Sequence, residues 1–191
     1  MKHSIHRTIS AAAARFLTGT LLLAILVSAS ASTSGAMQLI PSLGFTKATD
    51  SNAGDAKAFG SVALRAPILP FLSAEGGIAY RQESYFNDNL KLRMWPVTAS
   101  LWLTPVPMLY AGGGLGWYRT TLDYRSPLLK DKTTDKVGVH LGGGLAVPMA
   151  PALGLDLNGR YVFMQKENDL QLPTKFNPDF WSTSLGLAIK F

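Results

Sequence analysis

Cysteine is absent from this 191-residue sequence, and histidine is scarce. Without cysteine the chain can form neither a disulfide bond nor a thiolate-bound metal centre. Of the three histidines, His3 and His6 lie at the extreme N-terminus, so His140 stands alone in the rest of the chain. A lone histidine without carboxylates at a ligand spacing does not predict a metal site. We therefore expect no metal and no other cofactor.

Long apolar runs are also missing, apart from one short stretch near the N-terminus. Three basic residues precede this stretch, which is densest over residues 21–27 and is followed by A-x-A-like sites at 29–31 and 34–36. It is shorter than the ~20 residues that a membrane-spanning helix needs, which disfavours a helical anchor. The order of these features is typical of a cleaved secretory signal. We predict a signal peptide over residues 1–36 and one mature domain over residues 37–191.

The excess of basic residues is smaller than the whole-chain charge of +6 indicates. The predicted signal peptide contains three of the eighteen Lys and Arg residues and none of the twelve Asp and Glu residues, so its removal lowers the net charge to +3. A charge this small, without a basic run, does not favour nucleic acid as a partner.

The C-terminal segment 181–191 alternates between apolar and small or polar side chains. Leu185, Leu187, Ile189 and Phe191 share one face, while serine, glycine, alanine and lysine occupy the intervening positions. A period of two is that of a β-strand. A strand with an apolar outer face, a polar lumen face and a terminal aromatic residue is typical of a transmembrane β-barrel.

Short proline-containing segments alternate with longer polar stretches along the rest of the chain. Proline lacks the N–H that a β-ladder needs, so we expect turns at the short segments. Short turns that alternate with long loops are typical of outer-membrane barrels. The pattern predicts an all-β, eight-stranded antiparallel transmembrane barrel with both termini on the periplasmic side. The short segments are 67–70, 105–107 and 148–151, and the long ones are 49–57, 82–91, 120–136 and 165–179. The expected strands are 37–48, 58–66, 71–81, 91–103, 108–119, 136–147, 152–164 and 180–191.

Side chains of the expected strands alternate in the direction that suits lipid outside and a polar interior. Strand 136–147 has valine and leucine on one face and glycine, alanine and His140 on the other. Strand 152–164 has leucine on one face and charged or amide side chains on the other. A soluble lipocalin-like barrel would need an apolar interior, which is the reverse pattern. The first expected strand is the least regular, because Pro41 interrupts it.

Aromatic residues recur near the predicted outer ends of the strands. Segments 72–80 and 109–117 share the form Leu-x-Ala-x-Gly-Gly-aliphatic-small-aromatic, and each ends on its aromatic residue. Aromatic side chains form girdles at membrane–water interfaces. We expect Arg81, Arg93 and Arg119 to lie nearby and to face anionic headgroups. The predicted interfacial aromatics are Tyr80, Trp117, Tyr161 and Trp181.

Charged residues on the predicted inner faces form the main candidate site. Both signs are present, and buried charges are unfavourable unless they are paired, so we favour mutual ion pairing. Counting through the short turns places Glu75 opposite about Val62, with Arg65 on the diagonal. The same count places Asp156 opposite about Gly143. The predicted lumen ion-pair network is Arg65, Glu75, His140, Asp156, Arg160 and Lys190. The alternatives are a gated or leaky pore, and ligand binding or catalysis.

Two features suggest catalysis or nucleotide binding, but the sequence around them supports neither function. The glycine runs 112–114 and 142–144 do not open a helix, as a phosphate-binding loop must. Glycine inside a narrow barrel instead makes room for other side chains. His140 is expected in mid-strand, facing the lumen and out of reach of a lipid ester, and no nucleophile-elbow pattern accompanies it. We therefore expect no catalytic residues.

The chain resembles the outer-membrane β-barrel-domain family, the group of small eight-stranded barrels that includes OmpA-, OmpX- and OmpW-like proteins. The resemblance is carried by segment 109–118, segment 139–144 and the strand that ends at Phe191. It implies a Gram-negative-type outer membrane, insertion by the barrel-assembly machinery, and an assembly signal formed by Leu187, Ile189 and Phe191. No catalytic motif of such proteins is present to carry over, and we expect no cell-wall-binding domain after the barrel.

The expected function is a structural or surface-interaction role through the long loops of a monomeric barrel. Loops 120–136 and 165–179 are rich in charge, and exposed loops on a rigid scaffold commonly carry binding. We expect contact with outer-membrane lipids and lipopolysaccharide, and a surface ligand at the loops as a further partner. The alternatives are a narrow channel for small or apolar solutes and, less favoured, a lipid-modifying enzyme.

Replacing Phe191 with Ser should lower the amount of protein assembled in the outer membrane, because the last strand loses its aromatic end. Phe191→Trp is the matched control and should assemble normally, since it keeps an interfacial aromatic residue. The amount of heat-modifiable protein in the outer-membrane fraction on SDS gels measures assembly. Wild-type levels for Phe191→Ser would contradict the assembly role.

Overall fold

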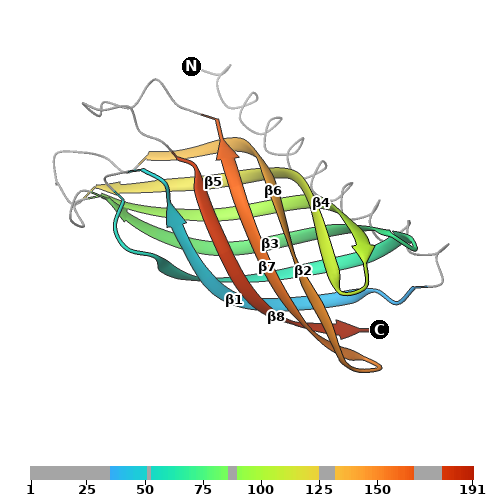
Figure 1. Ribbon diagram of the computed structural model, residues 1–191. Coiled ribbons are helices and arrows are strands. Elements are labelled where there is room, and N and C mark those ends of the chain that lie inside the picture. Colours follow the sequence, from blue (N-terminus) through green and yellow to red (C-terminus); the bar gives the residue numbers. More distant parts are fainter. Residues whose placement is uncertain (1–34, 51–52, 86–89, 125–131, 166–177) are drawn as a thin grey trace, which may run out of the picture.

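The computed structural model describes residues 35–50, 53–85, 90–124, 132–165 and 178–191, so the predicted signal peptide lies almost entirely outside it. These residues form one antiparallel β-sheet that closes on itself (Figure 1). The predicted fold class, an all-β closed barrel of eight antiparallel strands, is confirmed. The strands are β1 (Gln38–Ala48), β2 (Lys57–Leu69), β3 (Leu72–Tyr85), β4 (Leu90–Val106), β5 (Leu109–Tyr124), β6 (Lys132–Ala150), β7 (Leu153–Met164) and β8 (Phe180–Lys190).

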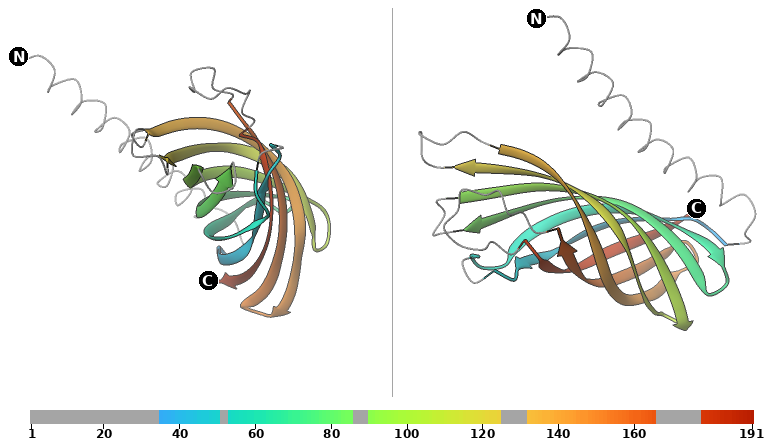
Figure 2. Two further views of the ribbon diagram at one scale, coloured as in Figure 1. Left: turned by 90° about the vertical axis from the view of Figure 1, so that its left-hand side faces the viewer. Right: turned by 90° about the horizontal axis from the view of Figure 1, so that it is seen from above.

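Closure of the barrel depends on pairing between the first strand and the last. Each strand pairs with the next, and β1 then pairs with β8 from Gln38↔Lys190 to Ala48↔Phe180. Figure 2 shows the strands curving around a common axis. The ladder between β1 and β8 skips Pro41 and the residue before it, as expected because proline has no N–H to donate. Nowhere in the described chain does a helix combine the length and the apolar character of a membrane span.

The outside of the barrel is apolar, whereas polar side chains point inward. Leu43, Leu115 and Leu141 are 75%, 60% and 57% exposed on the outer face. Glu75 and His140, by contrast, are 2% and 0% exposed inside. A contiguous apolar surface of this kind is unfavourable in water and suits a hydrocarbon surrounding. The alternation therefore follows the direction that the sequence predicts.

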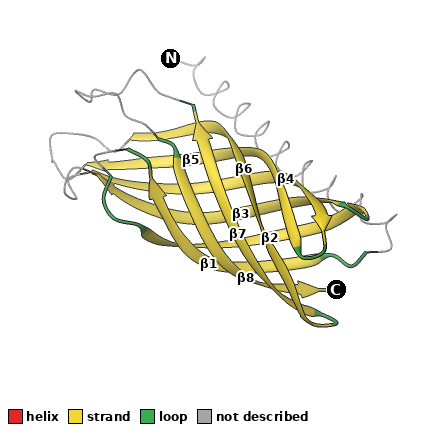
Figure 3. Ribbon diagram, viewed as in Figure 1, coloured by secondary structure: helices red, strands yellow, loops and turns green. Residues whose placement is uncertain are grey.

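The short turns lie at one end of the barrel, together with the C-terminus (Figure 3). The N–H of Phe191 donates to the carbonyl of Met37 over 3.0 Å, so the two described ends of the chain are neighbours. The predicted turns are partly wrong, because three of their prolines continue the strands beside register shifts. A bulge near a strand end tolerates a residue without an N–H. These prolines are Pro67, Pro105 and Pro148, and the turns themselves are 70–71, 107–108 and 151–152.

Strands β3 to β6 are longer than a membrane crossing requires. They contain 14, 17, 16 and 19 residues, whereas a tilted transmembrane strand needs ~9–11. The predicted boundaries are wrong here, because residues 82–85, 120–124 and 132–135 continue the strands. Their outward side chains are polar, which gives these segments the composition of a loop. We call the part of β3 to β6 that lies beyond their outward aromatic residues the polar wall, and its outward residues are Gln82, Lys91, Arg93, Arg119, Thr121, Thr133 and Asp135.

Arginine at position 141 should destabilise the barrel by about 2–4 kcal/mol, because Leu141 faces outward near the middle of β6. Thr133→Arg is the matched control, since Thr133 lies on the same strand in the exposed polar wall. Urea unfolding in lipid vesicles measures the free energy of unfolding of both variants. If Leu141→Arg unfolds at the wild-type urea concentration, the orientation of β6 is wrong.

Candidate functional site

Arg65 of β2 contacts two carboxylates inside the barrel. Its Nη2 lies 2.7 Å from Oε2 of Glu75 on β3, and its Nη1 lies 2.8 Å from Oδ2 of Asp156 on β7. All three side chains are buried. Strands β2 and β7 are not neighbours in the sheet, so the contact with Asp156 crosses the lumen.

A second arginine extends these contacts into a closed circuit. Nη2 of Arg160 lies 2.6 Å from Oε1 of Glu75, and its Nε donates to Oδ1 of Asn158 over 2.7 Å. Asn158 donates in turn to Oη of Tyr110 over 2.9 Å. The Tyr110 hydroxyl donates to Oδ1 of Asp156 over 2.8 Å, which returns to Arg65. We call these six residues the lumen network: Arg65, Glu75, Arg160, Asn158, Tyr110 and Asp156.

The lumen network uses a register that differs from the predicted one. Glu75 lies directly opposite Arg65, and Asp156 lies opposite Ala146, each three residues from the predicted neighbour. This difference in register has the same cause at both turns, namely that the strands continue through Pro67 and Pro148. Tyr110 and Asn158 were missing from the predicted set. Because side chains alternate along a strand, both residues occupy inward positions, and this alternation could have placed them in the predicted network.

Lys190 lies apart from the lumen network. Its side chain is half-buried at the short-turn end, and no ion pair joins it to another residue in the described ranges. The predicted set thus divides, with four of its charged residues in mutual contact and Lys190 elsewhere.

His140 forms a separate buried contact. Its Nε2 lies 2.8 Å from Oγ of Ser100, and its side chain is 0% exposed. A serine beside a histidine resembles the first two members of a nucleophilic site, which also needs a group that orients the histidine. Nδ1 of His140 has no hydrogen-bond partner among the described residues. Burial also keeps the pair away from a lipid ester, so the arrangement does not support catalysis. The described ranges contain no group of three His, Cys, Asp or Glu residues that could hold a metal ion.

Glycines beside the large lumen side chains provide the space that those side chains occupy. A Cβ on Gly144 would lie 2.5 Å from Oη of Tyr110. A Cβ on Gly116 would lie 2.6 Å from the ring of Tyr118. Contacts this short essentially never occur in proteins, so glycine at these two positions leaves the space that the inward tyrosine side chains occupy.

Arg81 points into the lumen, so the prediction that it faces headgroups is wrong. Its Nη2 lies 2.5 Å from Oε1 of Glu83, and its Cζ lies 3.6 Å from the centre of the Phe180 ring. The reason is strand parity, since Arg81 shares the inward face of β3 with Glu75 and Glu83. This second buried ion pair lies toward the long connections.

An apolar cluster surrounds this second ion pair and fills the same end of the lumen. It was not predicted, because the sequence patterns favoured a polar interior throughout. The sequence feature that could have predicted this cluster is an apolar residue at inward positions near the outer ends of the strands, as at Leu92 and Met94. Ala53, in the connection after β1, packs against it. The apolar cluster is Ala48, Leu92, Met94, Tyr118, Val162, Met164 and Phe180.

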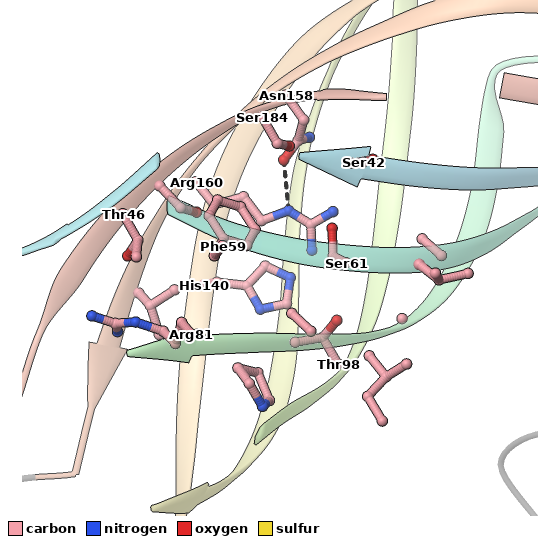
Figure 4. Close-up of a pocket in the computed structure, with 18 of the residues that line it drawn as sticks. Ser42, Thr46, Phe59, Ser61, Arg81, Thr98, His140, Asn158, Arg160 and Ser184 are labelled. Atoms are coloured by element: carbon pink, nitrogen blue, oxygen red, sulfur yellow. Dashed lines mark hydrogen bonds between the residues drawn. The ribbon is translucent and has the colours of Figure 1, made fainter. Parts of the chain in front are cut away.

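A small cavity of about 80 Å³, lined by both polar and apolar side chains, lies beside the lumen network (Figure 4). Small hydroxyl side chains on β1, β2, β4 and β8 line one side of it, and His140 and Arg160 line the other. The cavity is large enough for ordered water. It is far smaller than the ~300–1,000 Å³ of typical ligand pockets, so it does not support the ligand-binding alternative. The hydroxyl residues include Ser42, Ser61, Thr98 and Ser184.

The predicted interfacial aromatics all lie on the outer face of the barrel. Trp117 and Trp181 are 39% and 38% exposed, and Tyr161 pairs directly with Trp181 across β7 and β8. The ring of Tyr80 lies 4.7 Å from that of Trp95, which was not among the predicted aromatics. The residues of the predicted assembly signal, Leu187, Ile189 and Phe191, face outward at the short-turn end, where they are 38%, 37% and 69% exposed.

Comparison with known families agrees with the closed barrel and its inverted polarity. The model of the outer membrane protein β-barrel domain family matches residues 19–191. The chain belongs to this family. It is therefore a small β-barrel protein of the bacterial outer membrane. A search of curated proteins found no matching sequence.

Solved structures of small outer-membrane barrels share the fold. Neisserial surface protein A matches with a TM-score of 0.65 and 17% identity, over 81% of this chain and 97% of its own. Ail, the attachment invasion locus protein of Yersinia pestis, was solved in complex with the heparin analogue sucrose octasulfate. It matches with a TM-score of 0.57 and 14% identity, over 83% of this chain and 100% of its own. OprG of Pseudomonas aeruginosa matches with a TM-score of 0.55 and 14% identity, over 82% and 97%. At these identities the likeness concerns the fold alone.

Neutralising one member of the lumen network should destabilise the barrel more than neutralising an opposed pair. Glu75→Ala leaves the buried Arg65 and the partly buried Arg160 short of a carboxylate, which should cost about 3–5 kcal/mol. Arg65→Met added to Glu75→Ala should recover part of that loss, with a coupling energy of about 0.5–3 kcal/mol. A double-mutant cycle on urea unfolding in vesicles measures the coupling.

Lys190→Met is the matched control for this cycle, because Lys190 is a basic residue of the same lumen outside the network. Its effect should add to that of Glu75→Ala within about 0.3–0.5 kcal/mol. Strict additivity for Arg65 and Glu75 would mean that the interior is wet and that its charges are independently solvated.

Proposed function

We propose that this protein is a closed, non-catalytic outer-membrane barrel that acts as a rigid scaffold for interactions at the cell surface. The observation that carries the proposal is the lumen network, which links opposite parts of the barrel wall through its interior. An eight-stranded barrel encloses a space just wide enough for side chains. A filled interior leaves the outer face and the loop-bearing end as the surfaces available for function.

The filled lumen disfavours the alternative of a narrow channel. A solute that crossed the barrel would have to separate the lumen network and then pass the apolar cluster. Breaking a buried ion pair costs about 3–5 kcal/mol, and here Arg65 and Glu75 each take part in two such pairs. Two obstacles of different chemistry stand in series, so a change that relieves one does not open the other.

The polar wall supports a role at the surface. Strands β3 to β6 continue beyond the outward aromatics, and their exposed side chains change there from apolar to charged and hydroxylated. Hydrogen-bonded strands are more rigid than free loops, and a rigid scaffold positions binding residues. We propose that the polar wall and the longer connections above it face the outside of the cell, with both termini in the periplasm.

Single cysteines provide the test of this orientation, because the natural chain has none. Thr133→Cys, in the polar wall, should react with a membrane-impermeant maleimide in intact cells. Ala152→Cys, in the short turn between β6 and β7, should react only after the outer membrane is permeabilised. The amount of labelled protein on gels measures both reactions.

The opposite labelling pattern would overturn the orientation. A closed lumen further requires that the purified protein add no steady ion conductance to planar bilayers. Discrete conducting events from the folded, heat-modifiable protein would favour the channel over the scaffold.

A further inference from the structure

The three short turns of the barrel repeat one apolar pattern. In segments 69–72, 106–109 and 150–153 an apolar residue is followed by proline, then by phenylalanine, methionine or alanine, and then by leucine. Glycine, asparagine, aspartate and serine, which together with proline dominate turns, are absent from these segments. Charged residues are also absent from the longer stretches 66–74, 101–115 and 141–155. The short-turn end of the barrel therefore lacks the chemistry of a water-facing surface.

Met108 shows that the apolar character of the turns is kept against a conformational preference. Its φ is 70°, in the left-handed region that favours glycine or asparagine. A methionine at this position keeps a bulky apolar side chain at the cost of backbone strain. Phe71 occupies the same position of the turn between β2 and β3 and is 54% exposed. Two of the turns thus present large apolar side chains where small or polar residues would fit the backbone better.

The backbone of the turns is arranged to avoid unpaired polar groups. The six prolines of segments 67–70, 105–107 and 148–151 have no N–H that could remain without a partner. In addition, one carbonyl of each turn accepts a hydrogen bond from an N–H of the next strand along the sheet. These bonds join Thr104 to Phe71 over 2.9 Å, Ala146 to Met108 over 2.7 Å, and Lys190 to Ala152 over 2.9 Å. Because a backbone group without a partner is costly in hydrocarbon, this arrangement suits turns at membrane depth.

Strand length places the turns at the boundary of the hydrocarbon. In β3, β5 and β7 an outward aromatic residue follows the same turn position by nine residues. These pairs are Phe71 and Tyr80, Met108 and Trp117, and Ala152 and Tyr161. Nine residues of a strand tilted by ~40° rise about 23 Å, whereas the apolar band of such a barrel is ~25 Å tall. With the outward aromatics at one interface, the turns reach the other interface and do not project beyond it.

The turn end also continues the lipid-facing surface without a break. On β6 the outward positions from Leu141 to Met149 contain only leucine, glycine, valine and methionine. Met149, the last of them, is 60% exposed beside the third turn. At the opposite end of the barrel the polar wall separates the apolar face from water, and no such boundary occurs here. The same hydrocarbon surroundings therefore suit the outer face and the turn end.

We propose that the short-turn end is a lipid-binding surface that is seated among the phospholipids of the inner leaflet. Phe71 and Met149 extend into the acyl-chain region, while the backbone of the turns lies at the level of the headgroups. The small Ala152 of the third turn stays at that level, where water reaches it. The assignment to phospholipid rests on the proposed orientation of the barrel, whereas the depth of the turns does not depend on it.

Single cysteines that carry a nitroxide label test the depth in vesicles of phosphatidylethanolamine and phosphatidylglycerol. Oxygen concentrates in hydrocarbon and a nickel chelate stays in water, so the ratio of their collision rates with the label reports its depth. Phe71→Cys and Met149→Cys are the test variants. The matched controls are Leu141→Cys, near the middle of β6, and Thr133→Cys, in the polar wall. Heat modifiability on SDS gels shows that each labelled variant is folded.

The ratio of oxygen to nickel collisions at positions 71 and 149 should exceed that at position 133 several-fold and approach that at position 141. A ratio like that of position 133 at either test position would overturn the seating of the turns and would leave this end for a periplasmic protein. Cysteine labelling in cells decides the orientation separately. Buried turns with the reverse orientation would overturn only the assignment to phospholipid, because the turns would then lie in the outer leaflet.

Discussion

The pairing of β1 with β8 is the interaction on which the rest of this structure depends. In hydrocarbon no water is available for backbone N–H and C=O groups, and each unsatisfied group costs several kcal/mol, about 2–7 by transfer measurements. A sheet satisfies them all only when it closes, so the first strand must meet the last despite a proline in its path. Pro41 interrupts this ladder locally, and pairing resumes on both sides of it.

Closure with eight strands determines the character of the interior. The lumen is narrow enough that side chains from opposite walls meet, which is how Arg65 of β2 reaches Asp156 of β7. The tyrosines that project into this space require glycine beside them, as Tyr110 requires Gly144 on the neighbouring strand. The interior then contains two layers of different chemistry. Charged and amide groups form the lumen network, and apolar residues close the end toward the long connections.

A filled interior leaves the exterior as the surface available for the proposed function, and this exterior is not uniform. Strands β3 to β6 rise as the polar wall, whereas the outer face below it is apolar, as at Leu115 and Leu141. Both features come from side chains that face away from the lumen. They can therefore be changed without disturbing the contacts that keep the barrel closed, which suits the proposed scaffold role.

Much of the fold follows from the sequence by itself. The period-two alternation of β6 and β8 and the recurring prolines are local properties, and they determine the strand number and the inside–outside orientation without knowledge of distant residues. The same parity places Arg65, Glu75, Asp156 and Arg160 in the lumen. Parity also marks Arg81 as inward, although its position near a strand end favoured the membrane interface.

Tertiary structure alone decided which of these residues meet. The register depends on where each turn closes, and the strands continue through Pro67 and Pro148, which moved both ladders by three residues from the expected pairing. The partners Arg65 and Asp156 lie on strands that are not adjacent, so only the curvature of the closed barrel brings them into contact. The polar wall was not predicted from the sequence, because strand segments whose outer side chains face water have the same composition as loops.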